Sequence, residues 1–510
     1  MHKIQRVLIS VTDKTGVVEL ARELSGMSAE LVSTGGTARM IREAGIPVKD
    51  VAEVTGFPEM LDGRVKTMHP KIAGGILAMR ARPEHMRAIA EHGIQPIDMV
   101  VVNLYRFEEV AAKEGAALDE LIENIDIGGP TMIRAAAKNY QDVAVVVSPA
   151  DYASILEEMA RCEGGLSLQT KWELARQAFR TTADYDSAIS ARLALVGAAA
   201  PPLPPELRLR APKLMDLRYG ENPHQAAALY GRQGAGVAGA AQLQGKELSY
   251  NNLVDLDAAW QLACEFSGPA VAIIKHTNPC GCAEQETLAE AYRKALACDP
   301  VSAYGSVIGV SRQIDEETAR EMAKLFIEAI AAPGYSEAAL AVFASRKNLR
   351  LMRVAPGLDH LVVKSISGGL LAQTADRAAI TREQCQVVTR RAPTEEEWRG
   401  LEFAWKVAKH VKSNAIVYAR AGQTAGVGAG QMSRVDSARI GAMKAVLPLQ
   451  GTVVASDAYF PFPDGLEECA RAGATAFIQP GGSKGDPDVI AAADRLGAAM
   501  VFTGIRHFRH

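Results

Sequence analysis

Short runs of β-branched residues alternate along the chain with segments whose apolar residues recur at helical spacing. Before residue 200, RVLISV (6–11), MVVVNLY (99–105) and DVAVVVS (142–148) have the composition of buried strands, and VVELARELS (17–25) has the spacing of an amphipathic helix. Strands that alternate with helices usually form a parallel sheet. We therefore predict an α/β fold with a mainly parallel sheet in the N-terminal part.

The same alternation continues after residue 212, where two passages are loosely alike. Residues 305–324 and 425–445 each pass from a glycine-bearing strand through Ser-Arg into a helix. This likeness predicts a duplicated α/β unit with a seam near residues 375–395.

A proline-rich stretch, PPLPP at 201–205, marks the clearest boundary. Proline-rich segments stay extended, so we expect a linker here rather than the interior of a helix or strand. A chain of 510 residues also exceeds what one hydrophobic core usually supports. The predicted organisation is a domain at 1–200, a linker at 201–211, and two related subdomains at 212–385 and 386–510.

The composition narrows the class of protein. The chain is 48% hydrophobic and 23% charged, and its net charge of -3 gives no overall attraction to nucleic acid or anionic membranes. No apolar run reaches the ~18 residues of a membrane helix, and Asp13 and Lys14 break the N-terminal run too early for a signal peptide. Seven cysteines, an odd number, argue against a disulfide framework. We expect a cytoplasmic protein without a nucleic-acid or membrane partner.

Three glycine-bearing turns follow predicted strands and precede predicted helices, at 10–16 (SVTDKTG), 33–37 (STGGT) and 126–130 (DIGGP). A helix N-terminus offers unpaired N–H groups and a positive dipole end, and glycine lets the backbone approach a phosphate closely. The hydroxyl-rich turn at 33–37 is the best phosphate candidate. Each turn taken alone can also be read as an ordinary capped helix start.

Basic residues lie close to these turns in the sequence. If residues 64–71 (RVKTMHPK) are extended, Arg64 and Lys66 point to one face, and such a pair suits a nucleotide phosphate. Arg134 and Lys138, four apart on a predicted helix, also share a face. The alternative is a solvated basic surface. There is no Walker sequence and no GxGxxG at a helix start, which disfavours ATP-driven chemistry and hydride transfer.

In the second half, a strand that looks buried ends in Lys275 and His276. Histidine titrates near neutrality and lysine supplies positive charge or a proton, so the pair could share acid–base work, although such pairs also occur by accident. A zinc site of His276 with Cys280 and Cys282 is disfavoured, because CxC holds one zinc less readily than CxxC. The aromatic run at 459–462 (YFPF) suits stacking on a flat heterocycle or plugging the end of a sheet.

Taken together, the motifs resemble one family over essentially the whole chain. The matching segments are SVTDKTG, STGGT, RVKTMHPKI, NLY, IENIDIGGPTMIRAAAKNY, LRYGENPHQ, IKHTNPCG, SAYGS, VKSNAIVYA, GAGQMSR, SDAYFPFPD and IRHFRH. The chain resembles the bifunctional purine-biosynthesis enzymes that join an IMP cyclohydrolase to a transformylase acting on 5-aminoimidazole-4-carboxamide ribotide (AICAR). The resemblance implies a methylglyoxal-synthase-like parallel-sheet domain followed by a duplicated, metal-free cytidine-deaminase-like α/β region.

The resemblance also implies the chemistry and the partners. The cosubstrate 10-formyltetrahydrofolate, a reduced folate, would donate a formyl group to AICAR, and formyl-AICAR would then close to IMP with loss of water. The family forms homodimers with the transformylase site across the interface, uses no catalytic metal, and is compatible with a structural monovalent cation. Two alternatives are a catalytically silent nucleotide-binding or scaffold protein and a monofunctional transformylase.

In the implied cyclohydrolase site, Lys66 would stabilise developing charge and Lys138 would move protons. The residues that match the nucleotide pocket are Thr12, Lys14, Thr34, Gly35, Gly36, Thr37, Arg64, Lys66, Thr67, Asn103, Tyr105, Asp126 and Ile127. Ring closure requires little beyond holding the carboxamide nitrogen against the formyl carbon. Arg106, where the family commonly has proline, adds a charge near this pocket.

In the implied transformylase site, His276 would act as general base on the amine, and Lys275 would stabilise or protonate the tetrahedral intermediate. Asn414 and Asp464 match the other catalytic positions. The AICAR-binding matches are Arg218, Tyr219, His276, Gly305, Glu328, Asn414 and Arg506. The folate-binding matches, which rest on the resemblance alone, are Arg434, Val435, Tyr459, Phe462 and Ser483.

Overall fold

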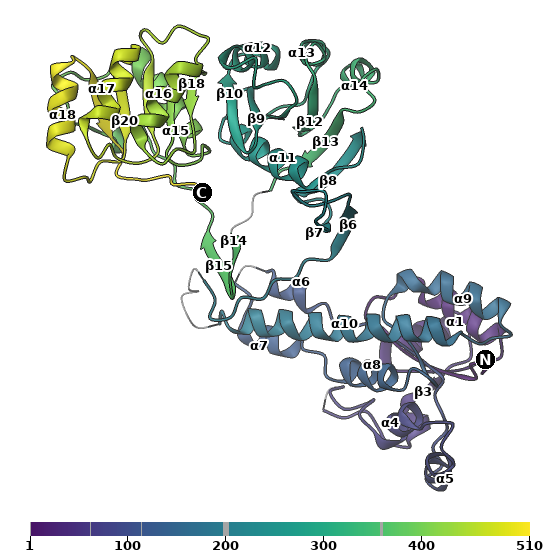
Figure 1. Cartoon of the computed structure of the whole chain (residues 1–510). Coiled ribbons are helices and arrows are strands. Elements are labelled where there is room, and N and C mark those ends of the chain that lie inside the picture. Colours follow the sequence, from purple (N-terminus) through teal and green to yellow (C-terminus); the bar gives the residue numbers. More distant parts are fainter. Residues whose placement is uncertain (1, 62, 114, 197–202, 358–360) are drawn as a thin grey trace. The chain divides into compact units, whose positions relative to one another are not determined.

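The computed structural model describes residues 2–61, 63–113, 115–196, 203–357 and 361–510 (Figure 1). The chain divides into two units, Met1–Pro201 and Pro202–His510, and each is described by itself. The predicted boundary at 200–201 and the first two prolines of the linker lie outside the described residues. Residues 203–211 form neither helix nor strand. The predicted subdivision at 385–386 stays a prediction.

The first unit is built on a five-stranded sheet in which all neighbouring strands are parallel. The strand order is β3-β2-β1-β4-β5. The strands are β1 (Arg6–Ser10), β2 (Glu30–Ser33), β3 (Lys49–Asp50), β4 (Met99–Val102) and β5 (Ala144–Val146). β4 and β5 are buried at every position, as in a sheet covered on both faces. The predicted parallel-sheet α/β fold of the N-terminal part is confirmed.

Helices cover both faces of this sheet. Val17 of α1 and Ile155 of α9 pack on one face, whereas Ile72 of α4, Met132 of α8 and Ala175 of α10 pack on the other. The helices are α1 (Val17–Gly26), α2 (Gly35–Glu43), α3 (Val51–Thr55), α4 (Pro70–Leu77), α5 (Pro83–Glu91), α6 (Phe107–Ala111), α7 (Leu118–Glu123), α8 (Gly128–Lys138), η1 (Pro149–Asp151), α9 (Tyr152–Arg161) and α10 (Leu168–Leu193).

The second unit contains a mixed sheet of twelve strands in the order β16-β21-β20-β19-β17-β18-β10-β9-β11-β12-β13-β8. The strands are β8 (Gly236–Gln244), β9 (Ala270–Lys275), β10 (Asn278–Glu284), β11 (Ser306–Val310), β12 (Ile327–Ala332), β13 (Arg350–Ala355), β16 (Gln386–Val387), β17 (Ile416–Arg420), β18 (Gln423–Gly428), β19 (Val453–Ser456), β20 (Ala476–Gln479) and β21 (Ala499–Phe502). β10 pairs with β18 at Ala283 and Gln423, so both halves of the unit form one sheet.

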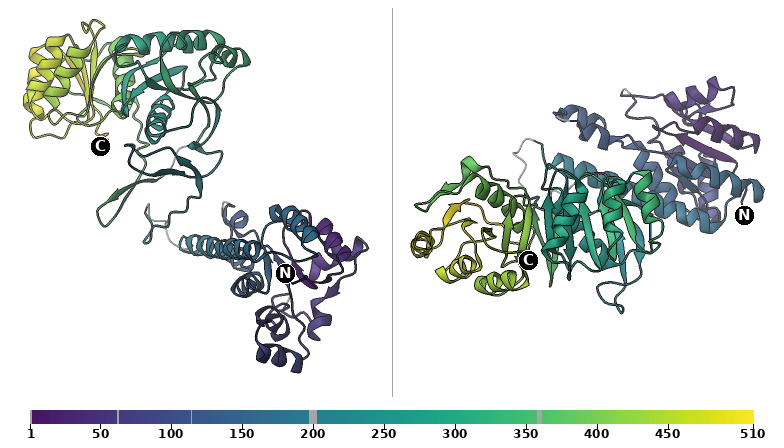
Figure 2. Two further views of the ribbon diagram at one scale, coloured as in Figure 1. Left: turned by 45° about the vertical axis from the view of Figure 1, so that its right-hand side comes forward. Right: turned by 90° about the horizontal axis from the view of Figure 1, so that it is seen from above.

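Two hairpins of this unit are separate sheets. They are β6 (Lys213–Leu217) with β7 (Ala227–Tyr230), and β14 (Leu361–Ile366) with β15 (Gly369–Thr374). Figures 1 and 2 show β14 and β15 standing apart from the large sheet.

The order of elements repeats within the second unit. The series α11, β9, β10, α12, β11, α13, β12, α14, β13 is followed by α15, β17, β18, α16, β19, α17, β20, α18, β21. The helices are α11 (Tyr250–Ala263), α12 (Leu288–Cys298), α13 (Glu316–Met322), α14 (Glu337–Phe343), α15 (Glu395–Ala408), α16 (Arg434–Lys444), α17 (Pro463–Ala472) and α18 (Asp486–Arg495), with a short 3-10 turn η2 (Arg382–Gln384) before α15. The predicted duplicated α/β region is confirmed.

The two passages matched from the sequence are, however, the wrong pair. Residues 305–324 contain β11 and α13, whereas residues 425–445 contain the end of β18 and α16, whose counterparts are β10 and α12. The likeness is misleading because strand-to-helix turns reuse the same small and capping residues wherever they occur.

One apolar layer spans both halves of the large sheet. Leu256 of α11 and Trp405 of α15 belong to a single buried cluster with Ile274 and Val417 from strands of the two halves. Separate clusters lie on the opposite face under α12–α14 and under α16–α18. In the described parts of the chain, no helix is long and apolar enough to cross a membrane.

Two candidate active sites

The first candidate site lies where parallel strands of the first unit end. Asn103 follows β4, and its Oδ1 accepts hydrogen bonds from the backbone N–H groups of Thr12 (2.6 Å) and Asp13 (2.9 Å), which follow β1. The Thr37 hydroxyl of α2 donates to the Val11 carbonyl at 3.0 Å. These bonds join three loops at the carboxyl edge of the sheet, which is the usual place for a ligand in such folds.

Two lysine ammonium groups converge on the first turn of α2. A Cβ atom on Gly36 would lie 3.9 Å from Lys14 Nζ, and one on Gly35 would lie 3.9 Å from Lys66 Nζ. Thr34, the N-cap, makes no side-chain cap bond, so the first N–H groups of the helix are left for another acceptor. Free N–H groups, a helix dipole and two ammonium groups together suit a phosphate.

The segment at 64–69 is not an extended strand, because Arg64 lies in a turn, Val65 forms an isolated bridge to Met60, and bends follow at residues 66, 67 and 69. The predicted shared face of Arg64 and Lys66 is therefore wrong. The backbones of Met60 and Val65 exchange two hydrogen bonds, of 3.1 and 3.2 Å, and close this turn. Arg64 is exposed and forms an ion pair with Glu123, whereas Lys66 forms an ion pair with Glu59 at 3.5 Å and reaches the start of α2. The local backbone bonds therefore direct the two cations to different groups.

Asp126 precedes α8 at the same site. Its Oδ1 accepts a hydrogen bond from the Gly129 N–H at 2.8 Å, and its own N–H donates to the Tyr185 hydroxyl at 2.8 Å. Burial raises the pKa of Asp126 above its ordinary value, against the lowering effects of the Gly129 and Tyr105 N–H groups and the Lys66 charge. A carboxyl group with a raised pKa is better suited to carrying a proton at neutral pH.

Of the other matches to the cyclohydrolase site, Thr67 and Ile127 lie at the start of α8 and Lys138 lies at its end. The Thr67 hydroxyl is buried, 2.7 Å from where a Cβ on Gly128 would be, and Ile127 is exposed. Lys138 occupies the last turn of this 11-residue helix, roughly 15 Å along the axis from its start. The structure does not bring Lys138 to the buried carboxyl group, and its role in proton transfer stays a prediction.

The second candidate site follows one edge of the twelve-stranded sheet. β9, β18, β19, β20 and β21 end at this edge, and β10, β11, β12 and β17 begin there, as the strand pairings require. Along it the structure places Arg506 after β21, Ser483 after β20, Tyr459 and Phe462 after β19, Asn414 before β17, Arg434 after β18, Lys275 and His276 at the end of β9, Gly305 before β11, and Glu328 in β12.

Lys275 and His276 lie in a tightly constrained turn. Lys275 closes β9, and its Nζ donates a hydrogen bond to the Tyr304 carbonyl at 2.6 Å. His276 is exposed, and it and Thr277 have φ values of 50° and 63°, in the left-handed region that residues with a Cβ atom rarely adopt. Asp255 of α11 accepts a hydrogen bond from the Thr277 N–H at 2.7 Å. Asp255 therefore holds the turn that presents His276.

Asn414 and Arg434 belong to one buried network in the second half of the sheet. Arg434 Nη2 donates to Asn414 Oδ1 at 2.8 Å, and Arg434 Nη1 donates to Asp457 Oδ1 at 2.5 Å and to Ser456 Oγ at 2.7 Å. Arg434 is 6% exposed and Asp457 is fully buried. Protein acceptors thus occupy the guanidinium that the resemblance matches to folate, and the folate contact stays a prediction.

Two AICAR matches lie in the first half beside Lys275. A Cβ on Gly305 would be 3.5 Å from Lys275 Nζ, and the positive φ of Gly305 (70°) would strain any other residue there. Glu328 forms an ion pair with Arg350 at 2.8 Å. Arg350 therefore fixes the Glu328 carboxylate at the same edge of the sheet.

The two matched arginines are exposed and lie over aromatic rings. The Arg218 guanidinium lies 4.9 Å from the ring centroid of Tyr219, and that of Arg506 lies 4.3 Å from the ring centroid of Phe508. Stacking of this kind holds a guanidinium in place while its N–H groups remain directed to solvent or to an anion.

The folate matches lie at neighbouring helix starts. Tyr459 and Phe462, between β19 and α17, are 40% and 66% exposed. Asp464, in the first turn of α17, accepts a hydrogen bond from the Gly465 N–H at 2.7 Å, and a Cβ on Gly465 would lie 3.9 Å from the backbone nitrogen of Val435 in α16. Exposed rings beside helix N-termini suit a flat ligand that carries anionic groups.

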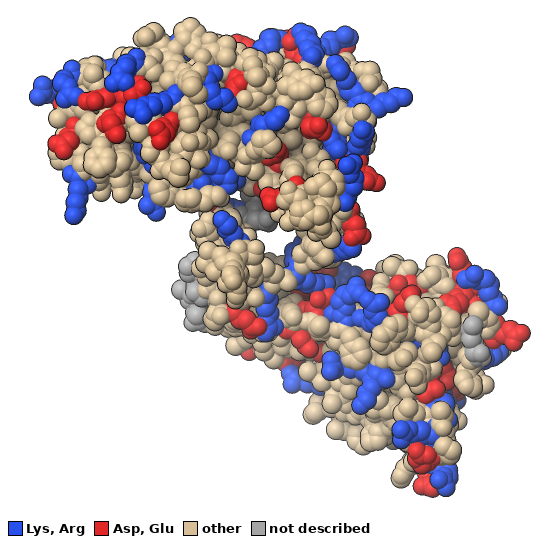
Figure 3. All heavy atoms as spheres, in the orientation of Figure 1, with Lys and Arg blue, Asp and Glu red and all other residues tan. Residues whose placement is uncertain are grey.

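The thiols near this edge are poor nucleophiles. Burial raises the pKa of Cys280 to about 12 and holds that of Cys282 well above its ordinary value. Within the described ranges, no three His, Cys, Asp or Glu side chains are grouped so that they could hold a metal ion. On the face shown in Figure 3, acidic and basic side chains are interspersed rather than gathered by sign.

Sequence reasoning missed two residues that position these sites. Tyr185 lies in α10, 59 residues from Asp126, so only the fold brings its hydroxyl to that backbone. Asp255 lies inside α11, where an acidic residue ordinarily suggests a solvated face. The spacing of residues does not reveal that the Asp255 carboxylate accepts a hydrogen bond from a backbone N–H in a strained turn.

Comparisons with known proteins cover both units. Residues 16–131 match the model of the MGS-like domain, and residues 136–444 match that of the AICARFT/IMPCHase bienzyme. The bifunctional purine biosynthesis protein PurH of Parvibaculum lavamentivorans is 55% identical over 531 residues, covering 100% of this chain and 98% of that protein. PurH of Brucella ovis is 54% identical over 530 residues, with the same coverage. The crystal structure of ForH is 34% identical with a TM-score of 0.36, covering 38% of this chain and 99% of that one.

Proposed function

The chain belongs to the AICARFT/IMPCHase bienzyme family, and from this premise we propose that its first unit closes formyl-AICAR to IMP and its second transfers the formyl group to AICAR. It is a bifunctional enzyme of purine biosynthesis with formyltransferase and cyclohydrolase activities, and its formyl donor is a folate. We assign 10-formyltetrahydrofolate as that donor. The MGS-like match at 16–131 falls wholly within the first unit, which supports this division.

Ring closure in the first unit depends on holding the nucleotide by its phosphate. Lys14 and the first N–H groups of α2 supply the positive field for that phosphate. The carboxamide nitrogen then bonds to the formyl carbon, and the former formyl oxygen leaves as water once it is protonated. We assign the proton transfer to Asp126, whose pKa burial raises, and the stabilisation of charge on that oxygen to Lys66.

Formyl transfer in the second unit requires a base for a weakly nucleophilic aromatic amine. His276 accepts a proton from this amine as the nitrogen bonds to the formyl carbon, and Lys275 stabilises the oxyanion of the tetrahedral intermediate. The bond from the formyl carbon to the folate nitrogen then breaks, and that nitrogen takes up a proton. Asn414 is held by Arg434 at the same sheet edge, where it can orient AICAR.

Each of the two activities is assigned to its unit on one main observation. For ring closure it is the convergence of Lys14 and Lys66 on α2, and for formyl transfer it is the Lys275–His276 turn. The direct test mixes the purified chain with AICAR and 10-formyltetrahydrofolate and follows all products by chromatography. Accumulation of IMP supports both sites. Formyl-AICAR without IMP would leave a monofunctional transformylase, and neither product would favour a silent nucleotide-binding protein.

We further propose that the enzyme works as a homodimer with the transformylase site completed across the interface. Large apolar side chains are exposed on the second unit, with Val301 at 81%, Met432 at 102% and Met443 at 77%. Burying such residues in water-excluded contact is favourable. Sedimentation should give a mass of about twice the 54.4 kDa of the chain, and Met443→Glu should shift it toward the monomer. A monomeric wild type would contradict the proposal.

A structural monovalent cation and a cytoplasmic location stay proposals from the resemblance. The cation is testable by unfolding the protein in potassium chloride and in choline chloride at equal ionic strength. Greater stability in potassium supports a bound cation, because a ligand of the native state stabilises it.

A further inference from the structure

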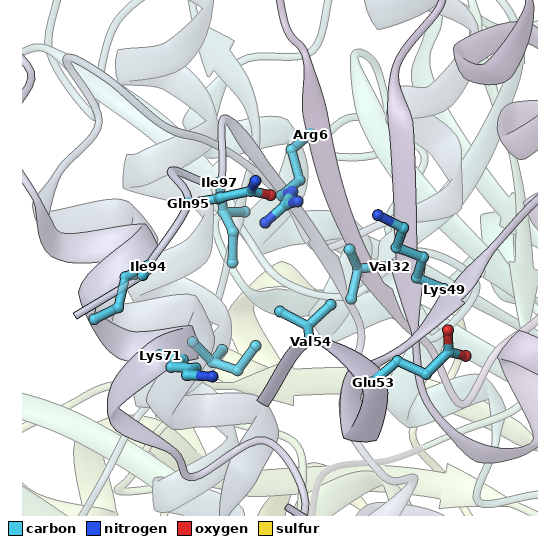
Figure 4. A pocket seen from close by; sticks show the side chains of 11 residues that line it. Arg6, Val32, Lys49, Glu53, Val54, Lys71, Ile94, Gln95 and Ile97 are labelled. Atoms are coloured by element: carbon cyan, nitrogen blue, oxygen red, sulfur yellow. The ribbon is translucent and has the colours of Figure 1, made fainter. Parts of the chain in front are cut away.

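A second cavity of the first unit reaches from the start of β1 to the start of β3. It has a volume of about 350 Å³, and Arg6, the first residue of β1, lines it. Figure 4 shows that Arg6, Lys49 and Lys71 reach it from β1, β3 and α4, with Val32 and Val54 on its apolar wall. Three cations from three elements, combined with an apolar wall, are the features of a ligand site rather than of a gap in packing.

The charges on the wall of this cavity leave one cation in excess. Arg6 is 8% exposed and its Nε donates a hydrogen bond to Glu30 at 2.5 Å, and Lys49 forms an ion pair with the same carboxylate. Glu53 accepts the hydrogen bond that caps the start of α3. Among the described residues, no hydrogen bond or ion pair engages the Lys71 ammonium. Glu53 lies in the lining, and Glu30 lies outside it but pairs with Arg6 and Lys49. Together these two carboxylates offset two of the three cations, so the site favours an anion of single charge.

The volume of the cavity and the apolar residues that line it limit the kind of anion that it can bind. A volume of about 350 Å³ lies at the lower end of the range for small-molecule pockets, about 300–1,000 Å³, so the ligand is small. Val32, Val54 and Ile94 offer apolar contact, whereas the ammonium of Lys71 offers charge. A phosphate dianion would exceed the available charge and leave the apolar wall without contact. A carboxylate that carries a hydrocarbon body satisfies both.

The same segment of chain also borders the cyclohydrolase site. Lys49 and Glu53 line the cavity, while Asp50 and Val51, between them in the sequence, line a small cavity that contains Thr34 and Lys66. A ligand that orders β3 and α3 from one side would therefore order the wall of the active site on the other. Binding of the nucleotide would then cost less conformational entropy.

We propose that this cavity binds a small monocarboxylate with an apolar body, and that its occupation tightens the binding of formyl-AICAR at the cyclohydrolase site. The second clause rests on the proposed function of the first unit, whereas the first does not.

Binding is tested by calorimetric titration of the full chain with 4-methylpentanoate. We expect one saturable site per chain, with binding at least about tenfold weaker for the neutral isostere 4-methylpentan-1-ol and for inorganic phosphate. Lys71→Met should weaken binding by about tenfold or more, and Val54→Phe, which fills the apolar side without changing charge, should abolish it. Lys113→Met, a surface lysine of the same unit that lines neither cavity, is the matched control and should bind as wild type.

Coupling is tested by the kinetics of ring closure with supplied formyl-AICAR. Saturating 4-methylpentanoate should lower the KM about twofold or more in the wild type and have no effect in Lys71→Met, with formyl transfer unchanged in both. No saturable binding, or undiminished binding by Lys71→Met, would overturn the site. An unchanged KM would overturn the coupling alone. If ring closure itself is absent, the proposed function fails while the calorimetry still reports on the site.

Discussion

The two candidate sites use the edge of a sheet in different ways. In the first unit, parallel strands end together, and flexible lysine side chains on separate loops meet at the start of α2. In the second, the antiparallel turn between β9 and β10 builds Lys275 and His276 into the edge itself, with a strained backbone. On the roles that we propose, ring closure relies on charge and proximity, whereas formyl transfer relies on one base held in a fixed position.

Replacing the base should separate the two sites most sharply. His276→Ala should lower the rate of formyl transfer by ~10²–10⁴-fold, the range for a general base, while closure of supplied formyl-AICAR stays near normal. Both rates are measured on the same preparation, so the second serves as the control for folding. A proportional loss of ring closure would show that the two activities do not occupy separate units.

The second largest effect should come from the buried network rather than from the reacting groups. Arg434→Met leaves Asp457 buried without its cation, and breaking a buried pair costs about 3–5 kcal/mol. We expect the free energy of unfolding of the second unit to fall by this amount in denaturant titrations. If stability is unchanged and the KM for folate rises instead, Arg434 contacts folate directly, as the resemblance implies, and its structural role is wrong.

A smaller loss of activity should follow from removing one of the two lysine charges at the cyclohydrolase site. Lys66→Met should lower the rate of ring closure by roughly 10²-fold, because a preorganised donor to a developing charge contributes about that much. Arg64→Met is the matched control. Arg64 is exposed and paired with Glu123, so its removal should cost far less. Equal losses would mean that both cations face the nucleotide, contrary to the turn at 60–65.

These differences also show how much of the fold and of the two sites could be predicted from the sequence. Alternating strands and helices were sufficient for the parallel sheet of the first unit, and the glycine-bearing turns at 10–16 and 33–37 do lie together at its edge. The extended reading of 64–71 failed because the backbone bonds between Met60 and Val65 close a local turn that composition does not reveal.

The second unit was harder to read for a physical reason. Its site residues lie on strands of both directions, so their order along the edge does not follow their order in the chain. The buried partner of Arg434 could not be predicted, because periodicity places an arginine at a helix start without saying that Asp457 lies beneath it. The resemblance named residues at this edge, but the burial that decides what their side chains can touch comes from the fold.

The smallest expected effect concerns Asp255, the positioning residue of the Lys275–His276 turn. A left-handed conformation costs a residue with a Cβ atom roughly 1–2 kcal/mol, and here two consecutive residues adopt it. The carboxylate of Asp255 offsets part of this cost through its hydrogen bond to the Thr277 N–H at 2.7 Å. Without that bond the turn should relax toward ordinary φ values, and His276 should spend less time in the productive position.

The change Asp255→Ala should therefore lower kcat for formyl transfer by about tenfold, the equivalent of ~1.4 kcal/mol, while leaving ring closure unchanged. Asp255→Asn keeps an oxygen that can accept the same hydrogen bond, so it should recover most of the rate. Recovery of the rate in Asp255→Asn would show that Asp255 acts by positioning the turn rather than by its charge. If Asp255→Asn is as slow as Asp255→Ala, the negative charge of Asp255 acts on His276 directly. The rate of formyl transfer would then depend on electrostatics, as we propose for ring closure in the first unit.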